Sequence, residues 1–191
     1  MKGAAWLLAL CLAAGGAGAE TPAPAGLPFP IALGGPFTLT DQSGAPRTEA
    51  APEADLQLLF FGYANCRSIC AVALPTMAAA TDMLVEQGFE ARPVMITVDP
   101  DHDTVATIGP PLHNHHPDFE GLTGMPAELQ PVYDLFAVEH EVLFTEPSGQ
   151  PVYAHGSHIY LLDGTGAFLT LVPPILGPER IAEIAARYVV R

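Results

Sequence analysis

Lysine is almost absent from this chain, because the only one is Lys2. Its 7 basic residues (Lys+Arg) are far outnumbered by 21 acidic ones, and the formal net charge is −14 over 191 residues. A surface of this sign repels phosphate backbones and anionic lipids, which argues against nucleic acids and membrane surfaces as partners. Metal ions and basic patches on other proteins are compatible with it.

The chain also lacks an apolar run long enough to suggest a membrane span at its start. The apolar residues 3–14 fall short of the about 20 that a transmembrane helix needs. Together with the small residues that follow, they make residues 1–19 a typical secretory signal peptide. We predict cleavage after Ala19 and export of a periplasmic protein that begins near Glu20. Cys11 lies inside the apolar run and is expected to be removed with the leader.

What remains is enough for one domain with a sizeable core. Residues 20–34 are rich in proline and are expected to form a tether or lead-in. The domain itself is expected to occupy residues 35–191, and the sequence contains no internal repeats.

The first half of this domain reads as strand, cysteine loop, helix and strand. The apolar run 56–61, bounded by Gly62, is typical of a buried central strand. Helical spacing over residues 71–87 and a second apolar strand at 93–98 complete the unit, and this order implies parallel pairing of the two strands. Residues 103–117 are predicted as a helix-poor loop, because Gly109-Pro110-Pro111 should interrupt any helix there.

The second half reads as mostly antiparallel. The expected elements are a helix at 126–137, a strand at 138–144, a turn at 148–150, strands at 158–162 and 167–172, and a helix at 178–189. Asp163-Gly164-Thr165-Gly166, between the last two strands, is a strong hairpin signal. The predicted class is therefore α/β with the thioredoxin layout: a central mixed β-sheet flanked by helices, with a C-terminal β-hairpin and helix.

Cysteine is scarce, since only Cys66 and Cys70 would remain after the leader. They lie at the predicted turn from strand to helix, where the helix N-terminus lowers thiol pKa values. Their spacing places both sulfurs on one side of a helical turn, close enough for a disulfide or for two bonds to one metal ion. Two thiolates suit Cu(I), with Zn(II) as the competitor. In an oxidising compartment the pair is expected to be bridged, metal-bound or cycled between these states.

Four segments resemble the Sco/SenC family in order and spacing: Pro36–Gly44, Phe60–Cys70, Thr97–Thr104 and Gly121–Gly124. The likeness extends from about residue 35 to the C-terminus. It implies a thioredoxin fold, copper held by the two cysteines and a distant histidine, and a role in assembling the CuA centre of cytochrome c oxidase.

The resemblance assigns Cys66 and Cys70 as thiolate ligands and His155 as the third ligand. Tyr160-Leu161 follows five residues after His155, as in the family. His158 is the rival, although its place in a predicted strand suggests a side chain that packs or faces solvent.

Three positions depart from the family pattern. Arg67 and Ala71 stand where a proline usually follows each cysteine, and the charge of Arg67 is expected to favour the thiolate form of the cysteines. Ala154 stands where an acidic residue often precedes the histidine. A carboxylate that orients His155 would then come from elsewhere, with Asp99 and Asp103 as candidates, or would be absent.

The remaining histidines offer a second hypothesis. His113, His115 and His116 form a short tract of a kind that can bind metal, with a solvated surface turn as the alternative. His102 and His140 are expected at the surface.

Two functions are compatible with the cysteines. In the first, a metallochaperone holds Cu(I) or Cu(II) on Cys66, Cys70 and His155 and passes it to the CuA subunit of cytochrome c oxidase or to another periplasmic copper protein. In the second, a thiol-disulfide oxidoreductase uses Cys66 to attack a partner's disulfide and Cys70 to resolve the mixed disulfide. His155 favours the first, because a dithiol reductase needs no third soft ligand.

Overall fold

The structure is a computed structural model that describes residues 32–189. The predicted leader, its cleavage site and the lead-in up to residue 31 lie outside the described residues. Within residues 32–189, no helix combines the length and the apolar character that crossing a membrane requires.

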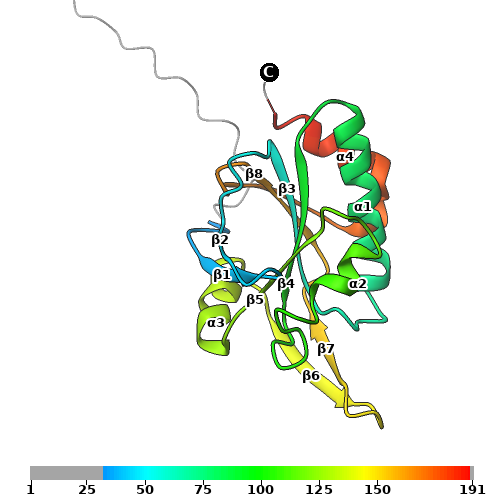
Figure 1. Ribbon diagram of the computed structural model, residues 1–191. Coiled ribbons are helices and arrows are strands. Elements are labelled where there is room, and N and C mark those ends of the chain that lie inside the picture. The colour runs from blue at the N-terminus through cyan, green and yellow to red at the C-terminus, as the bar shows by residue number, and fades with distance from the viewer. Residues whose placement is uncertain (1–31, 190–191) are drawn as a thin grey trace, which may run out of the picture. The chain divides into compact units, whose positions relative to one another are not determined.

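Seven strands of the described part form one mixed sheet in the order β2-β1-β5-β4-β3-β8-β9 (Figure 1). Their bounds are β1 Thr38–Asp41, β2 Pro46–Thr48, β3 Leu56–Gly62, β4 Ala91–Thr97, β5 Glu120–Thr123, β8 Ile159–Asp163 and β9 Phe168–Val172. β4 runs parallel to β3 and β5, whereas β8 pairs antiparallel with β3 and β9. The predicted parallel pair and the C-terminal hairpin are confirmed, while β1, β2 and β5 were not predicted.

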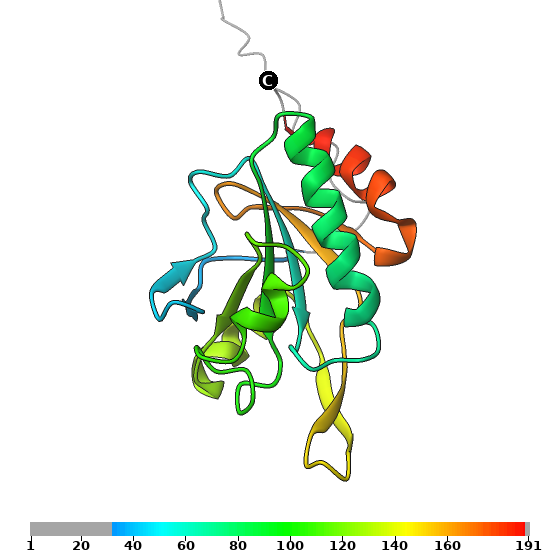
Figure 2. The ribbon, with the colours of Figure 1, turned by 45° about the vertical axis from the view of Figure 1, so that its right-hand side comes forward.

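Helices cover both faces of this sheet (Figure 2). Those on one face are α1 (Cys70–Glu86), α2 (Gly109–His113) and α4 (Pro178–Ala186), and α3 (Pro126–Leu135) lies on the other. A short 3-10 helix, η1 (Pro174–Leu176), precedes α4. The predicted helices correspond to α1, α3 and α4, of which α4 ends a few residues earlier than expected.

The expectation that Gly109-Pro110-Pro111 interrupts any helix in 103–117 is wrong, because α2 begins at Gly109. Pro110 and Pro111 lie in the first turn of this helix. The N–H groups of a first turn have no partner within the helix, so the missing proline donors remove no hydrogen bond there.

β3 joins the two cores of the molecule, since all of its residues are buried. Leu58 and Phe60 pack in the core beneath α1 and α4. Leu59 and Phe61 pack in the core beneath α3. Successive side chains of a strand point to opposite faces, so an unbroken apolar run fits a strand that is covered on both sides.

A separate two-stranded sheet is formed by β6 (His140–Thr145) and β7 (Pro151–His155). This hairpin projects beyond the end of the main sheet (Figures 1 and 2). The strand predicted at 138–144 corresponds to β6, and the predicted turn at 148–150 joins the two strands, where the Gly149 N–H donates to the Glu146 carbonyl at 2.9 Å. β7 was not predicted, and it returns the chain to the main sheet at His155.

Phe61→Ala is expected to lower the free energy of unfolding by about 3–5 kcal/mol, because it leaves a cavity in the core. The Phe61 ring lies 5.4–6.1 Å, centroid to centroid, from the rings of Tyr133, Phe136 and Tyr160. As a control, Val85→Ala on α1, where 51% of the side chain is exposed, should change stability by less than about 0.5 kcal/mol. Urea denaturation of both variants measures the difference, and equal losses would contradict the assignment of Phe61 to the core.

Candidate metal centre

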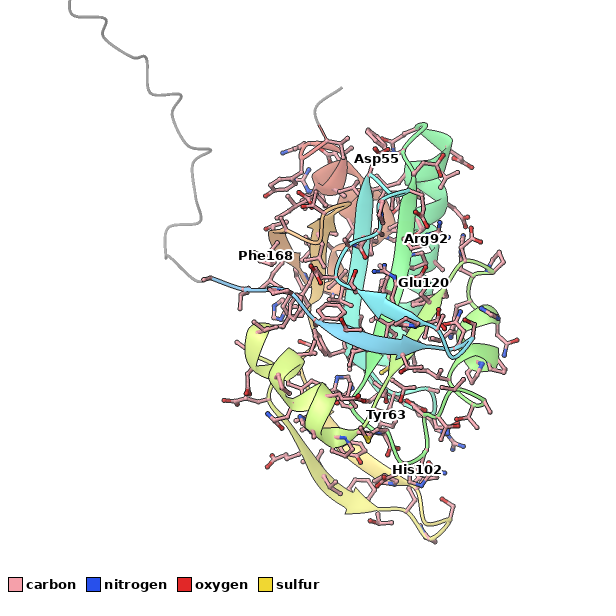
Figure 3. All side chains as sticks on the ribbon, turned by 60° about the vertical axis from the view of Figure 1, so that its left-hand side comes forward. Asp55, Tyr63, Arg92, His102, Glu120 and Phe168 are labelled. Carbon is pink, nitrogen blue, oxygen red and sulfur yellow. The ribbon has the colours of Figure 1, made fainter. Side chains whose placement is uncertain are left out.

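The two cysteines lie between the end of β3 and the start of α1. Cys70 is the first residue of α1 and is buried, with 1% of its surface exposed. Cys66 is half-buried in the preceding loop, where its N–H donates to the Tyr63 carbonyl at 3.1 Å. Figure 3 shows Tyr63 at the end of the sheet beside the hairpin, at the opposite end from Asp55.

Gly62 allows the cysteine loop to pack against β3. A Cβ atom at this position would lie 3.0 Å from the Cys70 Sγ and 2.8 Å from the Phe60 ring. Cβ atoms in proteins essentially never come closer than 3.0 Å to another atom, so a side chain here would displace the Phe60 ring and press on the Cys70 sulfur.

Asp103 ties the cysteine loop to β4. Its Oδ2 accepts hydrogen bonds from the Ala64 N–H at 2.9 Å and from the Thr97 hydroxyl at 2.7 Å. Only 1% of Asp103 is exposed, and this burial raises the pKa of its carboxyl group. Asp103 therefore positions the loop two residues before Cys66.

His155 ends β7 and reaches both cysteines from the hairpin. Its Nε2 lies 3.6 Å from the Cys70 Sγ and 3.8 Å from the Cys66 Sγ. Its Nδ1 lies 2.9 Å from the Gly156 carbonyl oxygen. A carbonyl oxygen only accepts hydrogen bonds, so Nδ1 carries a proton and Nε2 is the ring nitrogen that faces the two sulfurs.

Neither Asp99 nor Asp103 orients His155, so of the two alternatives the absence of an orienting carboxylate holds. The Nδ1 partner of His155 is the backbone carbonyl described above, and the Asp99 carboxylate instead accepts hydrogen bonds from the Tyr153 hydroxyl at 3.2 Å and from His102 Nδ1 at 2.9 Å. A backbone carbonyl is present whatever residue occupies position 156. Orientation of His155 therefore does not require the acidic residue that Ala154 replaces.

Aromatic residues that the sequence reasoning missed also hold His155. Its ring packs edge-on against Phe60 and Tyr63, each at a centroid distance of 5.8 Å. Tyr153 connects β7 to the domain, because its N–H donates to the Tyr63 hydroxyl at 3.4 Å and its own hydroxyl donates to Asp99. Alternation along a strand places Tyr153 and His155 on one face of β7, and recognition of β7 as a strand would have indicated this pairing.

The three proposed ligand atoms form a compact group. The Sγ atoms of Cys66 and Cys70 and a ring nitrogen of His155 all lie within 4.8 Å of one another. In residues 32–189, this is the only group of three or more His, Cys, Asp or Glu side chains that is close enough to hold a metal ion.

The other histidines lie elsewhere. His158 is exposed and directly precedes β8. Its side chain was expected either to pack or to face solvent, and it faces solvent. The His113, His115 and His116 tract is not gathered into such a group: His116 is buried and hydrogen-bonded to Asp82, at 3.2 Å.

His102 lies at the surface as expected, with 35% of its side chain exposed, whereas the expected surface position of His140 is wrong, because His140 is half-buried. His102 donates to Asp99 and lies, like Tyr63, at the end of the sheet opposite Asp55 (Figure 3). The ring of His140 lies 4.6 Å from the Tyr133 ring, centroid to centroid.

The two thiols share one proton unequally. A hydrogen bond from Cys70, together with contacts from His155 and Ser68, lowers the pKa of Cys66 to about 3. The same hydrogen bond and burial raise the pKa of Cys70. At neutral pH Cys66 is therefore a half-buried thiolate and Cys70 a buried thiol. Arg67, which was expected to favour the thiolate, is exposed beside Cys66.

Comparison with known proteins finds a family model described as SCO1/SenC, which matches residues 26–190. The SCO2-like protein of Rickettsia conorii is 33% identical over 141 residues, which are 73% of this chain and 68% of that protein. Protein SenC of Rhodobacter capsulatus is 31% identical over 153 residues, which are 79% of this chain and 68% of that protein.

Solved structures resemble the whole described domain. ScoI of Bradyrhizobium japonicum with copper bound has a TM-score of 0.73 and 33% sequence identity, covering 83% of this chain and 100% of that one. ScoI of Arabidopsis thaliana with copper bound has a TM-score of 0.76 and 29% identity, covering 82% and 97%. These matches confirm the predicted thioredoxin-like fold class.

Iodoacetamide is expected to modify Cys66 before Cys70 in the reduced, metal-free protein. Since the pKa of Cys66 is about 3, its rate should stay nearly constant between about pH 5 and pH 8, whereas an ordinary thiol slows about tenfold per pH unit below its pKa. His155→Ala removes a contact that stabilises the thiolate, so the Cys66 rate in this variant should fall more toward low pH. Peptide mass spectrometry measures both rates, and faster modification of Cys70 would refute the assignment.

Proposed function

Because this chain belongs to the SCO1/SenC family, we propose that it binds copper through Cys66, Cys70 and His155 and delivers it to the CuA site of cytochrome c oxidase or to another exported copper protein. The proposal rests on one observation: the two cysteine sulfurs and a ring nitrogen of His155 lie within 4.8 Å of one another. The choice of CuA as the destination rests on the family resemblance.

The chemistry of the three side chains fits copper. Thiolates and imidazole are ligands that copper prefers over carboxylates, and Zn(II) is the competitor for the same set. Binding would release the proton that Cys70 carries, because a metal-bound cysteine is a thiolate. Two of the similar structures, both called ScoI, hold copper.

The geometry also suits release of copper to a partner. Cys66 is half-buried, whereas Cys70 is buried. His155 lines an open hollow of about 500 Å³ together with Glu139, His140 and Glu141. An acceptor's ligands would therefore replace Cys66 and His155 first, while Cys70 still holds the ion.

Export belongs to the same proposal. Residues 1–19 have the pattern of a cleavable leader, residues 20–34 would be the lead-in and residues 35–191 the working domain. A periplasmic location suits a copper carrier whose acceptor is an exported site.

The unequal thiols favour one alternative, a thiol-disulfide oxidoreductase. The Cys66 thiolate would attack a disulfide of the copper acceptor, forming a mixed disulfide and releasing one acceptor thiolate. Cys70 would then lose its proton and attack the Cys66 sulfur, releasing the second acceptor thiolate. The products are a Cys66–Cys70 disulfide and a reduced acceptor, with two electrons transferred to the acceptor.

His155→Ala is expected to weaken copper binding by about tenfold or more, because one of three ligands is lost. His158→Ala is the matched control and should bind as the wild type does, since His158 is exposed and outside the group. Competition with a chromophoric Cu(I) chelator measures both affinities. If His158→Ala loses copper and His155→Ala keeps it, the ligand assignment is wrong; if Cys66→Ser and Cys70→Ser keep it, the site is wrong.

Complementation of a deletion strain separates delivery from reduction. If the chain delivers copper, His155→Ala should fail to restore the CuA absorbance of the isolated oxidase, and added copper should rescue it. If the chain acts only as a reductant, His155→Ala should restore CuA fully while Cys66→Ser and Cys70→Ser fail. The second pattern would overturn delivery in favour of the oxidoreductase.

A further inference from the structure

The hairpin exposes apolar side chains that no core covers. Val142, Leu143 and Phe144 are consecutive residues of β6, and they are 53%, 57% and 57% exposed. No other run in residues 32–189 exposes three consecutive large hydrophobic side chains. A strand over a core buries alternate side chains, but here both faces of β6 are open. Adjacent apolar side chains kept in water are typical of an interaction surface.

These three residues, which we call the hairpin patch, lie beside the metal centre. Phe144 lines a hollow of about 360 Å³ together with Asn65, Arg67 and Ser68 of the cysteine loop. The strand that pairs with β6 is β7, which ends at His155. A molecule that covers the hairpin patch would therefore contact both segments that carry the proposed copper ligands.

Charge indicates the kind of molecule. Between residues 138 and 155 the charged side chains are Glu139, Glu141 and Glu146, and there is no lysine or arginine. The whole chain carries a formal charge of −14. A partner with Lys or Arg around an apolar centre would match both features, and this complementarity would speed its approach.

We propose that the hairpin patch is the docking surface for the copper acceptor, whose docking face is apolar at its centre and basic at its rim. This inference deepens the proposed function and rests on it. The copper acceptor is the occupant because the hairpin patch is continuous with the centre from which copper must leave.

Side chains, rather than an added strand, make this contact. The pairing of β6 with β7 shifts register between Val142 and Phe144, so a bulge interrupts β6 at Leu143. A bulge hinders pairing of a further strand along an edge. Leu143 and Phe144 are then the apolar anchors of the interface.

The test compares two double variants in copper transfer. The first is Leu143→Ser with Phe144→Ser; the control is Val85→Ser with Ile175→Ser, at positions on α1 and η1 that are 51% and 87% exposed. Copper affinity of each protein alone is measured first, and it tests the proposed function independently of docking. Copper-loaded protein is then mixed with the reduced soluble CuA domain of cytochrome c oxidase subunit II, and the rise of the CuA absorbance gives the transfer rate.

The hairpin variant is expected to keep wild-type copper affinity and to transfer copper about tenfold more slowly, while the control transfers at the wild-type rate. Glu139→Gln with Glu141→Gln should slow transfer at low ionic strength and much less at about 1 M salt, where charges are screened. Wild-type transfer by the hairpin variant, an equal loss in the control, or lost copper affinity in the hairpin variant would each overturn the proposal. One further outcome would overturn it: the wild type dimerises in size-exclusion chromatography, and the hairpin variant is monomeric but transfers copper at the wild-type rate. The occupant of the hairpin patch would then be a second copy of this chain.

Discussion

The burial of β3 between two apolar cores is the constraint on which the rest of the structure depends. Because both faces of β3 are covered, its direction and its end point are fixed by packing on both sides. The chain leaves β3 at Gly62, the one residue type that admits the Cys70 sulfur so close to the strand. The place of the cysteine loop follows from this strand, and Asp103 and the start of α1 hold the loop there.

The chemistry of the centre comes from one proton held between two sulfurs. A thiolate at Cys66 is stabilised by the Cys70 thiol, and this arrangement serves metal binding and disulfide chemistry equally well. His155 separates the two uses, because its Nε2 adds a third ligand that disulfide exchange does not require. Since Nδ1 donates to the Gly156 carbonyl, Nε2 is the ring nitrogen that faces the two sulfurs.

The hairpin connects the chemistry to a partner. β6 and β7 contribute little to the two cores, yet they carry His155 at one end and three exposed apolar residues along β6. Tyr153 fastens β7 to Tyr63 and Asp99, so the strand that bears His155 is held to the domain while β6 stays open to solvent. Because the hairpin supplies both the proposed ligand His155 and an exposed apolar surface, it is suited to transferring copper to a partner protein.

Local patterns along the chain were enough to determine β3, α1, β4, the C-terminal hairpin and the position of the cysteines at a strand-to-helix turn. They succeed because apolar periodicity and turn residues act over a few neighbouring positions. They failed at α2, where the prolines fall in a first turn, and at β1, β2, β5 and β7, whose short runs are strands only because a neighbour pairs with them. The family resemblance pointed to His155, but the sequence alone did not exclude His158. Only the tertiary structure places His155, and not His158, beside the cysteines, and it shows that the Gly156 carbonyl, not a carboxylate, accepts from Nδ1 of His155. The reason is that Cys70 and His155 are 85 residues apart, so their contact depends on the path that β7 takes back to the cysteine loop.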